Sequence, residues 1–71
     1  MQRWAYASIR MKFSFEHGDW VASYNDGKEI VGIESLLNAY GAQGWELVSL
    51  TMEKIFNNDE YRATFKYPQN Q

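Results

Sequence analysis

Aromatic and basic side chains near the start of the chain are the residues best suited to bind a ligand. Arg10 and Lys12 alternate with apolar residues in this segment. If the first turn is centred on His17, antiparallel pairing places Tyr24 opposite Arg10 and brings Trp20 to the same face. A guanidinium beside an aromatic ring suits a flat anionic ligand, because the ring stacks on the ligand while the cation pairs with its negative charge. The residues predicted to bind a ligand or form an interface are Arg10, Lys12, Trp20, Tyr24 and Arg62.

Aromatic residues are frequent throughout the chain. Its 71 residues include three Trp, five Tyr and four Phe. Most of these rings are expected in the core, but one short helix cannot cover all of them, and exposed apolar patches mark interaction sites. We expect Trp20 and Tyr24 to be exposed, because their predicted face also holds Arg10 and Lys12.

Residues with the chemistry for catalysis or metal binding are few, and their spacing favours neither. His17 is the only histidine, there is no cysteine, and its polar neighbours in segment 16–19 are also what a hairpin turn needs. Segment 57–60 lacks the length and the central glycine of a calcium loop. Glu46 and Glu53 are seven positions apart, so on one strand they point to opposite faces. The sequence predicts a protein that is not an enzyme, with no catalytic residue, no metal site and no cofactor.

Hydrophobic periodicity predicts the elements that position these residues. Apolar and polar residues alternate in segments separated by Gly, Asn and Asp, and Asp26-Gly27 is the strongest hairpin signal. The predicted strands are residues 4–15, 20–25, 28–30, 45–56 and 61–67. A last turn is predicted at 57–59, which pairs Phe56 with Tyr61.

One segment has the spacing of a helical face, with apolar residues at Ile33, Leu36, Leu37 and Tyr40. Gly44 suits the left-handed residue that follows a helix, and Gly41 suits a close approach of the helix to the sheet. The fold class is therefore α+β, a β-β-α-β-β antiparallel sheet with one helix packed on one face. The other face has no second layer.

Strand alternation assigns side chains to the two faces. The face under the helix is predicted to carry Ile9, Met11, Phe13, Val21, Val48, Leu50 and Met52. The opposite face is predicted to carry the polar residues of the last hairpin, which are Ser49, Thr51, Glu53, Arg62, Thr64 and Lys66. In the first strand the alternation places Ala5 and Ala7 under the helix and Trp4 and Tyr6 on the open side.

The run from Leu36 to Ser49, with Gly-Ala-Gln-Gly-Trp-Glu-Leu-Val at its centre, resembles a family of small bacterial and phage proteins known as domain of unknown function 4177. The opening Trp4-Ala5-Tyr6 and the closing segment 61–66 are also similar to that family, so the resemblance spans nearly the whole chain. It implies a fold and no activity. It also implies an alternative in which Trp4 and Tyr6 point toward the helix, which a bulge near Ser8 would allow.

Length and charge limit the class of protein. A chain of 71 residues makes one domain, predicted to span 1–71 with a frayed tail at 68–71, and buries little surface for its size. Because no disulfide or zinc site can add stability, we expect a homodimer or larger assembly.

The net charge of −2 disfavours duplex nucleic acid as a partner. With neither a secretory signal nor a membrane span in the sequence, we expect a cytoplasmic protein with no membrane partner.

Three functions fit these observations. The preferred one is a non-catalytic homo-oligomeric module that binds or sequesters a small nucleotide-like or other flat anionic ligand in a cleft between subunits. The second is a protein–protein interaction or structural module that uses its open sheet face or an edge strand. The third is an aromatic sheet that stacks single-stranded nucleic acid, which the acidic net charge disfavours.

Overall fold

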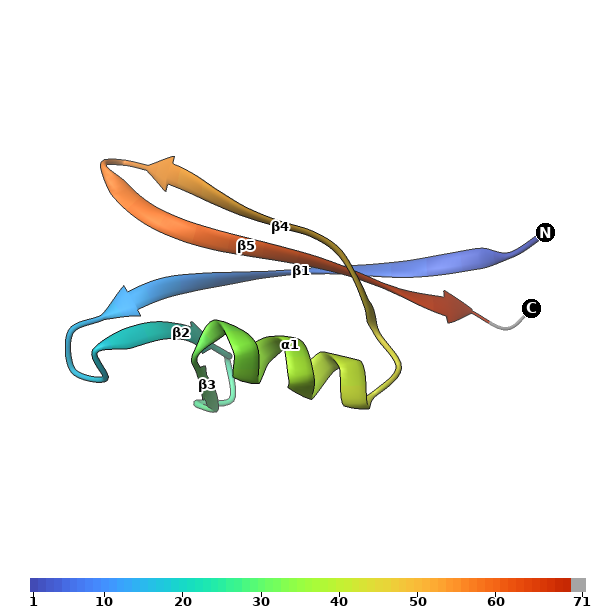
Figure 1. Cartoon of the computed structure of the whole chain (residues 1–71), viewed down its shortest axis with the longest axis horizontal. Helices are drawn as coiled ribbons and strands as arrows, with labels where there is room; N and C mark the ends of the chain where they lie inside the picture. Colours follow the sequence, from blue (N-terminus) through green and yellow to red (C-terminus); the bar gives the residue numbers. More distant parts are fainter. Residues whose placement is uncertain (70–71) are drawn as a thin grey trace.

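The computed structural model describes residues 1–69, which form one antiparallel sheet with a helix on one face (Figure 1). The strand order across the sheet is β3-β2-β1-β5-β4. Along the chain the elements are β1 (Arg3–Ser14), β2 (Asp19–Ser23), β3 (Glu29–Val31), α1 (Ile33–Ala42), β4 (Glu46–Ile55) and β5 (Asn58–Gln69). The predicted α+β class is confirmed. No helix within the described residues is long and apolar enough to span a membrane.

The two longest strands, β1 and β5, lie side by side in the middle of the sheet. They pair without a register shift from Arg3 opposite Gln69 to Lys12 opposite Glu60. A bulge near Ser8 would shift this register, so the alternative that turns the start of β1 toward the helix is wrong. Simple alternation along β1 therefore decides which side chains face α1.

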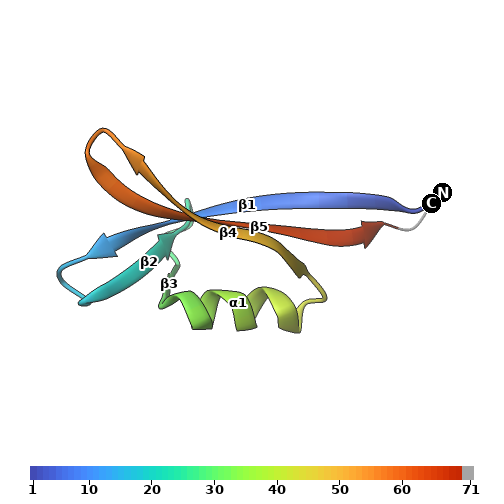
Figure 2. The ribbon, with the colours of Figure 1, turned by 45° about the horizontal axis from the view of Figure 1, so that its top comes forward.

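The end of β5 is more ordered than predicted. Pro68 and Gln69, expected to fray, lie in β5, and residues 70–71 of the predicted tail lie outside the described residues. β4 begins with Glu46 opposite Lys66, so Pro68 lies beyond the end of β4 and has a strand neighbour only in β1. At this end β1 and β5 extend together past α1 (Figure 2).

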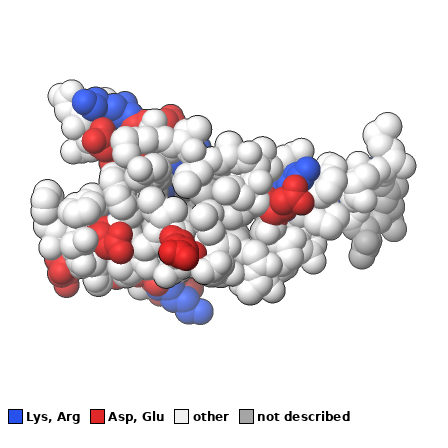
Figure 3. Space-filling view, in the orientation of Figure 1, with Lys and Arg blue, Asp and Glu red and all other residues white. Residues whose placement is uncertain are grey.

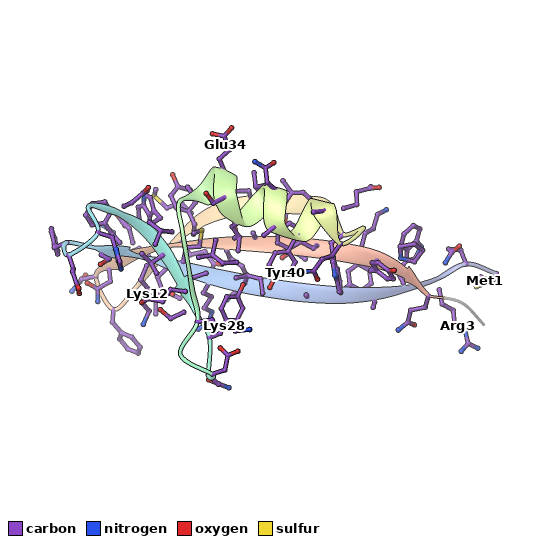
Figure 4. All side chains as sticks on the ribbon, turned by 90° about the horizontal axis from the view of Figure 1, so that it is seen from below. Met1, Arg3, Lys12, Lys28, Glu34 and Tyr40 are labelled. Atoms are coloured by element: carbon purple, nitrogen blue, oxygen red, sulfur yellow. The ribbon has the colours of Figure 1, made fainter. Side chains whose placement is uncertain are left out.

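Helix α1 forms where the apolar spacing predicts it. Leu36 is fully buried, and Tyr40 points from the helix toward the sheet while Glu34 points away (Figure 4). Gly44 follows the helix with a φ of +93°, as predicted, and Trp45 N–H donates to the Tyr40 carbonyl.

The close approach of backbone to side chain occurs at a different glycine from the one predicted. A Cβ at Gly41 would meet nothing within 4 Å, so the role predicted for Gly41 is wrong. A Cβ at Gly44 would lie 3.0 Å from the Tyr67 ring. The chain therefore passes closely over β5 just after the helix ends.

The core lies between α1 and the middle of the sheet. The Tyr40 ring stacks on Phe65 with centroids 4.5 Å apart. Residues of β1, β2, α1 and β5 form the buried cluster, which consists of Met11, Ala22, Leu36, Ala63 and Phe65.

The first hairpin has a register one residue away from the predicted one. Ser14 pairs with Asp19, and Gly18 N–H, at a φ of +67°, donates to the Ser14 carbonyl at 2.7 Å. The loop thus holds an even number of residues, whereas a turn centred on His17 needs an odd number. Phe13 consequently pairs with Trp20.

This register exchanges the faces of β2. Trp20 joins Met11 and Phe13 on the side of α1, and Val21, predicted under the helix, lies with Lys12 on the opposite side. The prediction that Trp20 and Tyr24 share a face with the basic residues of β1 is wrong for this reason.

The last hairpin turns earlier than predicted. Ile55 pairs with Asn58, so Phe56 and Asn57 are the two turn residues, with φ of 50° and 66°. Two residues of positive φ match the twist of the flanking strands. The predicted turn at 57–59 and the predicted pairing of Phe56 with Tyr61 are wrong.

The β4–β5 ladder contains one register shift between Leu47 and Ser49, where Val48 forms a bulge. On the far side of the bulge, Leu50 and Met52 keep the predicted helix side, opposite Ala63 and Tyr61. Both are nevertheless exposed, because the β4–β5 hairpin extends away from α1 (Figures 1 and 2).

Candidate functional site

The side of the sheet away from α1, here called the open face, carries the strongest concentration of ligand-binding chemistry. Its β1 residues alternate with those under the helix, and those from Trp4 to Lys12 are all exposed. Its β5 residues lie opposite them in the uninterrupted register. From these two strands the open face presents Trp4, Tyr6, Ser8, Arg10, Lys12, Glu60, Arg62, Thr64 and Lys66.

Two guanidinium groups face each other at the middle of the open face. Arg10 is directly opposite Arg62, and like charges in such cross-strand pairs repel. Arg62 Nε lies 3.2 Å from Glu53 Oε1 on the neighbouring strand. Arg10 forms no ion pair with any other residue in 1–69. Arg62 thus has a carboxylate partner and Arg10 has none, which leaves the Arg10 guanidinium available for an anion.

The surface around Arg10 is hollowed on two sides. A hollow of about 320 Å³ is lined by Arg10, Lys12, Val21 and Ser23. A second, of about 270 Å³, is lined by Ser8, Ile9, Arg10, Ser23, Tyr24 and Asn25. Arg10 and Ser23 border both, so a guanidinium and a hydroxyl are within reach of a molecule in either hollow.

Aromatic rings occupy the other end of the open face. The Lys66 ammonium lies 4.3 Å from the centroid of the Trp4 ring and 3.6 Å from Glu46 Oε2. Tyr6 pairs with Lys66 across the ladder and is 65% exposed. Four residues of strand separate Tyr6 from Arg10, which is about 13 Å. A ring and a negatively charged group on one small molecule can span that length.

Hydroxyl groups lie between the rings and the guanidinium groups. Ser8 Oγ and Thr64 Oγ1 are 3.2 Å apart on the open face. The order along β1 is therefore aromatic, hydroxyl and cation. This sequence of groups matches a ligand with a flat ring, a polar middle and an anionic end.

The predicted site residues divide between the two faces. Arg10, Lys12 and Arg62 lie on the open face. Trp20 contacts the Phe13 and Tyr61 rings on the side of α1, at centroid distances of 5.5 and 4.7 Å.

Tyr24 also belongs to the helix side. Its hydroxyl lies 2.9 Å from that of Tyr40, and burial together with this hydrogen bond raises the pKa of Tyr24 above its usual range. Tyr24 still borders the smaller hollow beside Arg10. A ligand there can touch Tyr24 but finds no stacking surface from Trp20.

The sequence prediction of the site omitted Trp4, Tyr6, Thr64 and Lys66. The signal was present, because strand alternation already placed Trp4 and Tyr6 on the side of Arg10. The register predicted for the first hairpin placed the aromatic residues of β2 beside Arg10, so those residues were predicted as the site instead.

His17 and the acidic residues, which were not predicted to be catalytic, form few contacts with one another. His17 Nε2 lies 3.3 Å from Glu29 Oε1, and both side chains are partly exposed. Within residues 1–69, no three His, Cys, Asp or Glu side chains gather in a way that could hold a metal ion.

A family model described as "Domain of unknown function (DUF4177)" matches residues 4–68, nearly the whole chain. No curated protein and no solved structure matches the chain.

Proposed function

This chain belongs to the family described as domain of unknown function DUF4177, and we propose that it is a non-catalytic binding module for a flat anionic ligand. The ligand class is nucleotide-like, a ring system carrying a phosphate or carboxylate. The observation that carries the proposal is the Arg10–Arg62 pair, in which Arg62 has a carboxylate partner and Arg10 has none. The module is a cytoplasmic bacterial or phage protein.

The ligand lies along β1 on the open face. Its anionic group sits between Arg10 and Arg62, where it relieves their repulsion and accepts charge-assisted hydrogen bonds. Its ring stacks on Tyr6, the exposed aromatic residue nearest to the cations. Ser8 and Thr64 hydrogen-bond the middle of the ligand. This arrangement retains the ligand class and the cations predicted from sequence and replaces the aromatic partners.

A second copy of the chain completes the module along β4. This strand is an edge of the sheet and exposes Leu47, Val48, Leu50 and Met52. Exposed apolar edge strands pair readily with other strands. Antiparallel pairing of two copies about Leu50 brings the exposed apolar residues of the two β4 edges together. The open faces of the two copies then form one continuous surface.

Calorimetric titration with a nucleoside diphosphate tests the ligand. Arg10→Ala is expected to weaken binding about 10- to 150-fold, the equivalent of about 1.5–3 kcal/mol for a charge-assisted hydrogen bond. Tyr6→Ala is expected to weaken it through loss of stacking. The matched control is Lys28→Ala, an exposed cation whose nearest carboxylate is Asp26 at 3.9 Å. Equal affinities for Arg10→Ala and Lys28→Ala would contradict the proposal.

A protein-interaction module is the second candidate, and the exposed apolar residues of β4 favour it. In this case native mass spectrometry finds the assembly but no retained small molecule. Leu50→Lys then dissociates the assembly, and Arg10→Ala leaves it intact. If the protein sediments as a monomer at about 50 μM, with a melting temperature independent of concentration, association along β4 is wrong.

A further inference from the structure

A hollow separates the two hairpins at the end of the sheet opposite the chain termini. The β1–β5 ladder ends at the pair Lys12–Glu60, and beyond it the β1–β2 hairpin and the β4–β5 hairpin diverge (Figures 1 and 2). Figure 3 shows the resulting notch between the two lobes. Its volume is about 440 Å³, and it is lined by Lys12, Phe13, Phe15, Trp20, Asn58, Asp59 and Glu60.

One wall of the hollow is aromatic. Phe13 contacts the Phe15 and Trp20 rings edge to face, with centroids 5.3 and 5.5 Å away. Phe15 is 94% exposed, so its ring is available to a ligand. Aromatic faces carry partial negative charge and attract cations within about 6 Å.

The other wall contains a buried carboxylate without a partner. Glu60 is only 7% exposed, and its Oε1 accepts no hydrogen bond from any described residue. Lys12 lines the same hollow and is opposite Glu60 in the ladder, but its ammonium forms no ion pair with any carboxylate in residues 1–69. A buried charged oxygen without a donor is costly, which makes the hollow receptive to an N–H group.

The charges of the lining favour a cation. Glu60 and Asp59 contribute two carboxylates, and Lys12 contributes one ammonium. The lining thus has a net charge of −1, whereas the middle of the open face is positive. An ammonium group can interact with both walls of the hollow, because it donates hydrogen bonds to a carboxylate and is attracted to aromatic faces.

We propose that this hollow binds a small organic cation, a protonated primary amine attached to an apolar or aromatic body. The ammonium pairs with the Glu60 carboxylate, and the body lies against Phe13 and Phe15. This site lies beyond the Arg10–Arg62 pair, and Lys12 borders both this hollow and the hollow beside Arg10.

Nuclear magnetic resonance titration of the full chain with benzylammonium tests the site. We expect saturable shifts of the Trp20 indole N–H resonance, and none with benzyl alcohol, the neutral analogue, at the same concentrations. Glu60→Gln is expected to weaken benzylammonium binding about 10- to 150-fold, as the loss of a charge-assisted hydrogen bond implies. The matched control is Glu16→Gln, which removes the same charge from an exposed residue of the neighbouring turn.

A second variant keeps the test decisive if Glu60→Gln alters the fold. Phe15→Ala removes an almost fully exposed ring, so it is expected to leave the fold unchanged and to weaken benzylammonium binding. Equal shifts with benzylammonium and benzyl alcohol would overturn the proposal. Unchanged benzylammonium affinity in Phe15→Ala would overturn it as well.

Discussion

The two faces of the sheet are built from alternate residues of the same strands, yet they differ in how completely their side chains are satisfied. On the covered face, Leu36 is fully buried and Tyr40 stacks on Phe65. On the open face, Tyr6 is exposed and Arg10 is opposed by Arg62 rather than by a carboxylate. The part of the covered face beneath α1 is filled by side chains of the chain itself, whereas the open face has unmatched charge and an uncovered ring. Stability and binding are therefore expected to respond to different substitutions on one strand.

The largest effect on stability is expected at the centre of the covered face. Leu36→Ala should lower the free energy of unfolding by about 2–5 kcal/mol, because it leaves a cavity between α1 and the sheet. Urea denaturation measures this change. Glu34→Ala, on the solvent side of the same helix, is the control and should stay within about 0.5 kcal/mol. Similar losses in the two variants would mean that the helix does not bury the face described.

A smaller loss is expected where the chain leaves the helix. Gly44→Ala should cost about 1–3 kcal/mol, because the new Cβ combines a positive φ with a contact 3.0 Å from the Tyr67 ring. Gly27→Ala has a similar φ of +87° but meets nothing within 4 Å, so it measures the backbone strain alone. Thermal unfolding should rank Gly44→Ala as the less stable of the two. The reverse order would contradict the close packing over β5.

The hydrogen-bonded hydroxyl groups of Tyr24 and Tyr40 on the covered face predict a loss of stability at alkaline pH. Because the pKa of Tyr24 is raised in the folded state, the folded protein keeps a proton that the unfolded chain loses above about pH 10. The stability is therefore fully present below pH 10 and falls as the pH rises further. Melting temperatures measured from pH 8 upward should show this fall, and Tyr24→Phe should reduce it. An identical pH dependence in both proteins would remove Tyr24 as its cause.

The smallest effect on stability is expected on the open face. Arg10→Ala removes one member of a like-charged pair, so its free energy of unfolding should stay within about 0.5 kcal/mol of the parent protein or rise slightly. Chemical denaturation at low salt is the appropriate measurement, because salt screens the repulsion. A loss above about 1 kcal/mol would show that Arg10 supports the fold, and the contrast between the faces would fail.

Local patterns made several features predictable. The spacing of Leu36 and Tyr40 identified the helix, and Gly44 marked its end, because both depend on residues within a few positions of one another. The alternation along β1 also assigned Arg10 to the correct face. The candidate site could be predicted to this extent, as a row of basic residues on one side of a long strand.

The register of the hairpins could not be predicted in this way. In the first hairpin, Gly18 closes a loop one residue shorter than a turn centred on His17, and that single residue moved Trp20 to the covered face. In the last hairpin, Phe56 adopts a positive φ that its residue type does not favour. Local residue propensities predicted both turns incorrectly, because the packing of the strands decided the lengths of the turns.

The sequence by itself determined the α+β composition, the helical stripe and the alternation of β1, since each follows from the period of one element. Only the tertiary structure decided that Arg10 faces Arg62, that Tyr6 replaces Trp20 beside the cations, and that Glu60 is buried without a partner. These features depend on how two distant strands are aligned. A shift of one residue in that alignment exchanges the two faces of a strand. The alignment is therefore selected by the burial of side chains over the whole sheet, and not by the residues of any single turn.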